Sequence, residues 1–291
     1  MYKSKRFHYD YDDVEEGEKG VDTMLAEIME DGEFSSLEEI VIGCWGEAWD
    51  DSCQPLIDGM IENKDKFAHI KSLYFGDMDY EDCEVSWIIQ GNYSKLWEAL
   101  PNLEKLVIKG STDLELGEIA HDNLKELQII CGGLGKDLIE SVQKAKLPNL
   151  ENLVLYIGSD WYGFDGDIST VKTFLEQSDF PKLTHLGVED SEIQDEVVEC
   201  VLDSKYAGQV TSLSLANGTL TDKGGECILE KLPNYANIKK LDLHYHYMSD
   251  EMMKKLEKFA EEQSIELDVS EQEEAYDSGD GDLTYTAMLT E

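Results

Sequence analysis

Basic residues are scarce in this chain of 291 residues. It has 24 Lys and Arg against 64 Asp and Glu, which gives a formal net charge of −40 with histidine neutral. Nucleic acids are bound through Lys and Arg that release condensed counterions, so we expect no nucleic-acid partner. Anionic membrane surfaces are disfavoured for the same reason. A basic partner is compatible with this charge, although strong acidity also serves solubility.

Long apolar segments and paired cysteines are lacking too. The amino terminus is briefly basic and then acidic, with no apolar stretch behind it, so we expect neither a secretory signal nor a membrane span. The six cysteines show no CxxC or other paired spacing. We interpret them as small core residues of a reduced, cytoplasmic protein.

Motifs that carry known chemistry are also missing. The sequence has no GxSxG, no Walker A motif, no GxGxxG after a strand and no HExxH. Gly132-Gly133-Leu134-Gly135 follows a predicted strand, but it lacks the Lys-Ser/Thr pair of a phosphate loop, and glycines more simply allow a tight turn. We therefore expect no enzymatic activity and no cofactor.

The chain does contain one phrase many times: an apolar residue, two others, an apolar residue, one other, an apolar residue. The eight copies are Leu37-Ile40-Ile42, Ile70-Leu73-Phe75, Leu103-Leu106-Ile108, Leu124-Leu127-Ile129, Leu150-Leu153-Leu155, Leu183-Leu186-Val188, Val210-Leu213-Leu215 and Ile238-Leu241-Leu243. A ninth, degenerate copy is Leu267-Val269. Successive copies start 21 to 33 residues apart, which is the range of a leucine-rich repeat.

Each repeat has a strand half and usually a helix half. Leu213 and Leu215 alternate as in a strand, and Leu220, Ile228 and Leu232 then give a helix one apolar stripe. Helices are predicted at 52–67, 88–99, 134–146, 167–178, 192–204, 222–231 and 249–262, whereas 110–117 is predicted to be irregular. Stacking these units predicts an α/β leucine-rich-repeat solenoid, a right-handed horseshoe with a parallel concave sheet and helices on the convex side.

The chain divides into three predicted parts. They are an amino-terminal cap of one strand and one helix (1–35), a leucine-rich-repeat domain of eight to nine repeats (36–269) and an acidic mobile tail (270–291). In the cap, Phe7, Tyr9 and Tyr11 alternate with charged residues as in an edge strand. A cap is expected because an open solenoid end exposes both core and strand edge. The tail is too acidic to bury much surface, although its last residues could dock as an extended segment.

The stretch from Leu213 to Leu232 resembles the ribonuclease-inhibitor-like class of leucine-rich repeats. That class usually has Asn or Cys three residues after the last strand leucine. Here those positions hold Trp45, Met78, Ser111, Gly132, Gly158, Ser191, Gly218 and His246, so we expect less regular repeats.

Three phrases are more narrowly similar to an uncharacterised bacterial leucine-rich-repeat family. They are residues 42–49 (IGCWGEAW), 75–87 (FGDMDYEDCEVSW) and 241–250 (LDLHYHYMSD). This resemblance implies a cytoplasmic binding or accessory role in a small pathway, and it supplies no catalytic residue.

Strand alternation predicts which side chains line the concave face. Tyr74, Tyr156, His185, Asp242 and His244 are the candidate binding residues there. Aromatic side chains anchor interfaces, and solenoids bind through their concave surfaces. The alternative is that these side chains only pack against one another across adjacent strands.

The rim loops that leave the strands are the second candidate surface. Trp45, Trp49, Asp77, Trp161 and Tyr162 place aromatic rings beside carboxylates, which suits a cationic or peptide ligand. The clustered aspartates of these loops could also hold Ca²⁺ or Mg²⁺, but their spacing matches no EF-hand loop, so a metal ion is disfavoured. Alternatively, the tryptophans cap the layers of the solenoid.

His244 and His246 lie two residues apart and could bind zinc if His185 supplied a third ligand. Zinc needs three or four convergent ligands, and two histidines are weak support. We therefore predict no metal site and interpret the two as ordinary surface histidines.

The sequence as a whole predicts a monomeric, non-enzymatic module that binds a protein or peptide. An alternative is an accessory protein that presents a peptide, its own tail included, to a modification enzyme. A metal-dependent enzyme ranks last.

Overall fold

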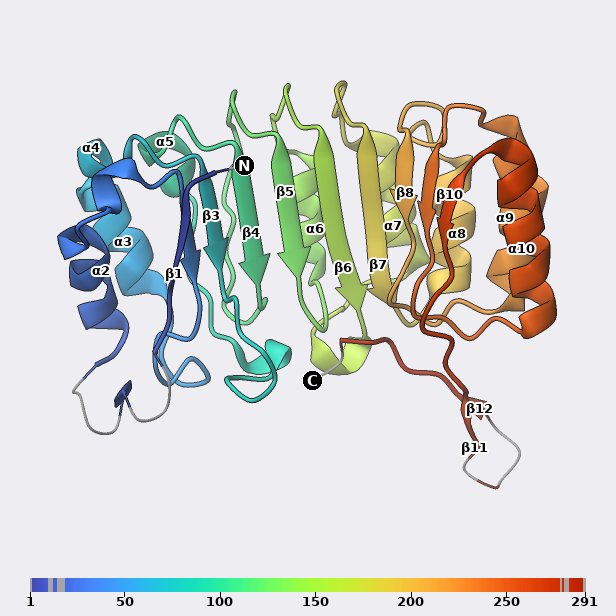
Figure 1. The fold of residues 1–291 in the computed structure, drawn as a ribbon, viewed down its shortest axis with the longest axis horizontal. Coiled ribbons are helices and arrows are strands. Elements are labelled where there is room, and N and C mark those ends of the chain that lie inside the picture. The colour runs from blue at the N-terminus through green and yellow to red at the C-terminus, as the bar shows by residue number, and fades with distance from the viewer. Residues whose placement is uncertain (1, 10–12, 15–18, 278, 280–282, 290–291) are drawn as a thin grey trace.

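A parallel sheet of ten strands, which follow one another in sequence order, forms the centre of the structure (Figure 1). This computed structural model describes residues 2–9, 13–14, 19–277, 279 and 283–289. The strands are β1 (Ser4–Phe7), β2 (Glu39–Ile42), β3 (Ser72–Phe75), β4 (Lys105–Lys109), β5 (Glu126–Ile130), β6 (Asn152–Gly158), β7 (His185–Ser191), β8 (Ser212–Ser214), β9 (Lys240–Asp242) and β10 (Glu266–Asp268). Parallel neighbours require a crossover connection, so every connection returns over the same face.

Helices cover one face of this sheet, and the other face is open (Figure 1). The α-helices are α2 (Val21–Glu30), α3 (Gln54–Glu62), α4 (Lys64–Phe67), α5 (Leu96–Ala99), α6 (Lys136–Gln143), α7 (Ile168–Gln177), α8 (Gln194–Asp203), α9 (Asp222–Lys231) and α10 (Asp250–Gln263). Short 3₁₀ turns lie at η1 (Phe34–Ser36), η2 (Val85–Trp87), η3 (Asp160–Tyr162) and η4 (Leu232–Asn234). The result is an α/β repeat-like fold, as the repeated phrase predicts.

The middle apolar residue of each phrase fixes the register. Neighbouring strands pair these residues in one line: Ile40, Leu73, Leu106, Leu127, Leu153, Leu186, Leu213, Leu241 and Leu267. Leu267 in β10 shows that the degenerate ninth copy also forms a strand. Because side chains alternate along a strand, this line sends the residues on either side of it to the open face.

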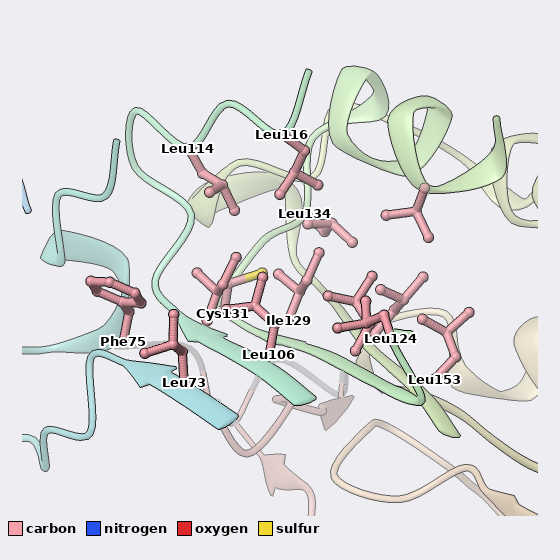
Figure 2. Close-up of a cluster of buried hydrophobic side chains, with 14 of the residues drawn as sticks. Leu73, Phe75, Leu106, Leu114, Leu116, Leu124, Ile129, Cys131, Leu134 and Leu153 are labelled. Atoms are coloured by element: carbon pink, nitrogen blue, oxygen red, sulfur yellow. The ribbon is translucent and has the colours of Figure 1, made fainter. Parts of the chain in front are cut away.

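The core lies between the sheet and the helix layer. In Figure 2, Leu73, Leu106 and Leu153 rise from their strands, and Leu116 and Leu134 approach them from the connecting segments. All five side chains are buried. The cysteines are unpaired, and four of the six are buried in this region of the fold, in agreement with their interpretation as small core residues.

The predicted helices form in most repeats, with 88–99 as the exception. Only Leu96–Ala99 is helical there, and Ile89 and Asn92 instead bridge to Thr112 and Glu115 in an extended arrangement. The segment is extended because it buries Ile88, Gln90 and Tyr93 toward the core. The irregular crossing predicted at 110–117 is observed, and it forms the other side of these bridges.

Both ends of the chain add elements to the repeats. At the amino end β1 pairs in parallel with β2, α2 buries Met24 and Ile28, and Tyr9 is buried; Tyr11 lies outside the described residues. At the carboxyl end β11 (Tyr276–Asp277) and β12 (Leu283–Thr284) form an antiparallel pair. The mobility expected for 270–291 stays a prediction.

Among the described residues, every helix is too short or too polar to cross a lipid bilayer.

Truncating one side chain in the line of paired apolar residues should lower the stability of the fold considerably. Leu153→Ala removes a fully buried side chain between β5 and β7. We expect it to lower the free energy of unfolding by about 2–5 kcal/mol, because the cavity it leaves closes only partly. Urea denaturation measures this value. The control Glu176→Ala, on the exposed side of α7, should change it by less than about 0.5 kcal/mol, and equal effects would contradict the assigned role of the line.

Candidate functional site

Buried polar side chains gather where β6, β7 and β8 end. We call Tyr156, Glu189, Asp190 and Asn217 the edge cluster. The Asn217 side-chain amide donates to the Tyr156 hydroxyl (3.0 Å) and to Oε2 of Glu189 (3.0 Å). Glu189, Asp190 and Asn217 are almost completely shielded from solvent. Buried polar groups are costly unless they are paired, so a cluster of this kind at a sheet edge is a candidate binding site.

Two adjacent carboxyl groups give the edge cluster its electrostatic character. Burial raises the pKa of Asp190 to about 9, the charge of Glu189 adds to this rise, and the hydrogen bond from the Leu289 N–H opposes it. Burial also raises the pKa of Glu189, with a contribution from the charge of Asp242. Asp190 therefore carries its proton at neutral pH. The edge cluster therefore carries less negative charge than its two carboxyl groups would give if both were ionised.

Beside this cluster, three successive repeats hold a non-glycine residue in the left-handed backbone region. They are Asp190 in β7 (φ 57°), Asn217 (φ 65°) and Tyr245 (φ 54°), each two residues past the last apolar residue of its repeated phrase. Gly110 takes the corresponding place after β4. Such conformations cost little for Asn or Asp and more for Tyr, and they gather at functional sites. Their repetition in the repeats of β7, β8 and β9 marks this part of the edge.

The carboxyl-terminal segment lies against these same loops. In Figure 1 it returns from β12 along the lower edge of the sheet toward β6. The Met288 N–H donates to the Asn217 carbonyl (2.8 Å), and the Leu289 N–H donates to Oδ1 of Asp190 (2.8 Å). The Tyr247 hydroxyl donates to the Thr286 carbonyl (2.9 Å). These contacts are made through the main chain of the segment.

The concave-face candidates fall into one group of four and one outlying residue. Tyr156, His185, Asp242 and His244 belong to β6, β7 and β9 or the residues that follow them, so the structure brings them to one region of the open face. Tyr74 is in β3, on the same face but away from this group. Burial raises the pKa of Tyr74 to about 12.

The pKa values of the two histidines of this group shift in opposite directions. His244 Nδ1 lies 2.7 Å from Oδ1 of Asp242. Burial lowers the pKa of His244, but the hydrogen bond and charge of Asp242 outweigh it and the net shift is upward. His185 pairs with Ser212 (2.8 Å), and burial lowers its pKa despite the charge of Asp242. His244 is therefore the more readily protonated of the two.

The rim candidates are dispersed, and one is not at the surface. Trp161 is 86% exposed, Trp49 is also exposed and Tyr162 is half-buried. Asp77 pairs with the guanidinium of Arg6 (2.6 Å), which ties β1 to the loop after β3. Trp45 differs from the expectation. Its side chain is fully buried and donates to the Asp51 carbonyl (2.9 Å), so no ligand reaches its ring.

The histidine pair weighed for zinc is divided between two environments. His246 is fully buried; its Nε2 lies 3.0 Å from the Val269 carbonyl and its Nδ1 accepts the Met248 N–H (3.1 Å). Both ring nitrogens are therefore engaged, and the expectation of a surface histidine is wrong for His246. Over the part of the chain that the structure describes, no group of three His, Cys, Asp or Glu is arranged to hold a metal ion.

Asp190 and Asn217 were not singled out from the sequence. The signal available was their type and place: Asp and Asn tolerate the left-handed region best after glycine, and each stands two residues past the last apolar residue of a repeated phrase. The docking of residues 286–289 had no comparable signal beyond the general possibility of an extended segment.

Comparison with solved structures identifies a similar protein. A crystal structure of a protein from Bacteroides fragilis, a structural-genomics target, superposes with a TM-score of 0.86 and is 39% identical in sequence. The alignment covers 94% of this chain and 75% of that protein. This chain belongs to the same family as the Bacteroides fragilis protein. No family model and no curated protein matches the chain.

The raised pKa of Asp190 predicts a specific pH dependence. The folded protein keeps this proton up to about pH 9, whereas the unfolded chain releases it near pH 4, so Asp190 makes unfolding easier as the pH rises between these values. Asp190→Asn keeps the shape, tolerates the backbone conformation and cannot ionise. We expect the variant to gain stability relative to the natural chain as the pH is raised from 5 to 9.

Urea denaturation at several pH values measures this difference. The control is Asp179→Asn, at an exposed carboxylate, which should run parallel to the natural chain. Parallel curves for Asp190→Asn as well would show that Asp190 is ionised in the folded protein.

Proposed function

We propose that this protein is a non-enzymatic binding module whose open sheet face and adjoining strand ends take an extended segment of a protein or peptide. The observation that carries this proposal is the position of residues 286–289. They cross the strand ends and are held through their main chain by Asp190, Asn217 and Tyr247. A surface that holds one extended segment through its backbone suits others, because main-chain contacts are common to all sequences.

The architecture we propose is a leucine-rich-repeat horseshoe whose open face is concave. Ten parallel strands in sequence order and one in-register line of apolar residues support it. In such solenoids each unit contacts mainly its neighbours, which leaves one long face available for a partner.

The side chains of the open face suit a polar partner with some aromatic contact. Tyr74 and Tyr156 provide rings, and Asp242 with His244 provides a paired acid and base. The net charge of −40 favours a basic partner and disfavours nucleic acid and anionic membranes. We propose a monomer in the cytoplasm, where a reducing environment keeps cysteines unpaired as they are here.

The second candidate is an accessory protein that presents its own tail to a modification enzyme. Exposed Tyr276, Leu283 and Tyr285 in and beside the β11–β12 pair favour it, because an enzyme could reach them. This candidate predicts that removal of residues 271–291 abolishes the function. The binding module does not need the tail for its activity.

Affinity capture from a bacterial cytosol tests the proposal. The natural chain should retain a partner, and Tyr74→Ala, Tyr156→Ala and His244→Ala combined should reduce retention at least ten-fold. A matched triple variant at exposed helix positions, Lys172→Ala, Glu176→Ala and Lys254→Ala, should retain it. Melting curves establish that both variants are folded.

A third variant keeps this test decisive. Trp161→Ala changes the most exposed rim ring without touching the open face. Retention lost in that variant alone would move the binding surface to the rim, and equal retention by all variants would contradict the proposal.

The charge of the chain predicts how association depends on salt. With the captured partner, we expect the association rate constant to fall at least about three-fold between 50 and 300 mM NaCl, because screening weakens long-range attraction to a basic partner. Stopped-flow or surface plasmon resonance measures this rate. A rate that does not change with salt would show that the acidic surface serves solubility alone.

A further inference from the structure

Residues 286–289 follow a regular path across the strand ends. The Thr286 carbonyl accepts from Tyr247 and from Tyr245 in the loop after β9 (2.9 and 3.4 Å). Met288 then contacts Asn217 after β8, and Leu289 contacts Asp190 at the end of β7. Residues 286, 288 and 289 thus contact three successive repeats, those of β9, β8 and β7. The contacts use the left-handed residues that lie beside the edge cluster: Asp190, Asn217 and Tyr245.

One side chain of this segment enters the protein. Ala287 is 2% exposed, whereas Thr286 and Met288 on either side of it are exposed. A methyl group is small, and protein interiors are close-packed, so a large side chain at this position would not fit without displacing its neighbours. The edge therefore selects a small residue at one position and the main chain at the positions around it.

The segment leaves part of the edge cluster unsatisfied. Oδ2 of Asp190 and Oδ1 of Asn217 are buried and have no hydrogen-bond partner among the described residues. An unmet buried polar atom is costly, so an occupant that supplied an acceptor to the protonated Asp190 carboxyl and a donor to Oδ1 of Asn217 would be held more firmly than residues 286–289. The chain's own segment occupies the site without completing it.

We propose that residues 283–289 are an internal occupant of the partner's site, displaced by an extended partner segment that places a small side chain where Ala287 lies. This inference rests on the proposed binding function and names the site and the shape of its ligand. The internal segment competes at a high effective concentration because it is part of the same chain. A partner segment must therefore bind the site with enough affinity to displace the internal segment.

Fluorescence anisotropy with a synthetic peptide of residues 283–289, labelled at its amino end, tests this. We compare the natural full-length chain with Ala287→Trp, in which the internal segment cannot seat. The peptide should bind the variant at least ten-fold more tightly, because its site is vacated. The control chain Glu274→Trp, which adds the same ring at an exposed position outside residues 283–289, should behave like the natural chain.

A second peptide tests the requirement for a small residue. The same peptide with Trp in place of Ala287 should bind neither chain. Equal binding of the natural peptide to the natural chain and to Ala287→Trp would overturn the inference, and so would no binding to either. Tight binding of the Trp peptide would overturn the selection of a small side chain.

The partner found by capture separates this inference from the proposed function. Ala287→Trp should retain more of that partner than the natural chain does. Unchanged retention, together with loss in the open-face variant, would leave the binding function standing and overturn the role of the internal segment. If the open-face variant also retained the partner, the proposed function itself would fail.

Discussion

Each strand of the sheet hydrogen-bonds only to its immediate neighbours, and this pairing holds one apolar residue from each of the strands β2 to β10 in a single line against the helices. A shift of one residue in any strand would turn that line to the open face and the open-face residues into the core. The register is therefore strongly specified, and with it the position of every side chain discussed here. Tyr156 and Glu189 meet because β6 and β7 pair in this register.

The sequence predicts the repeated part well because each repeat carries its own signal. The apolar pair Leu213 and Leu215 and the helical stripe that follows are both local patterns, and β8 and α9 form where they indicate. The segment 88–99 carries a weaker pattern. Its apolar residues fit a helix as well as an extended chain, and only the neighbouring crossing at 110–117, which offers bridge partners, decides between them.

The candidate site is less accessible to this reasoning, since its contacts are not periodic. Alternation places Tyr156 and His244 on the open face, but it says nothing of how a loop folds after the strand ends. The Trp45 ring is buried and its indole N–H donates to the Asp51 carbonyl within the same loop, a contact that strand alternation does not predict. The contact of Leu289 with Asp190 joins residues 99 apart in sequence, with no pattern to announce it.

That same contact changes how the carboxyl-terminal half opens. A linear stack of repeats frays from its free end, because the last unit has a neighbour on one side only. Here the Leu289 N–H binds Asp190 in β7, so this contact closes a loop of the chain that contains β8, β9 and β10. While this contact is made, the backbone amides of the three strands would exchange with solvent together. Once it is broken, they would exchange in order, beginning with β10. The presence of residues 286–289 at the strand ends would thus make local unfolding of these three repeats less favourable.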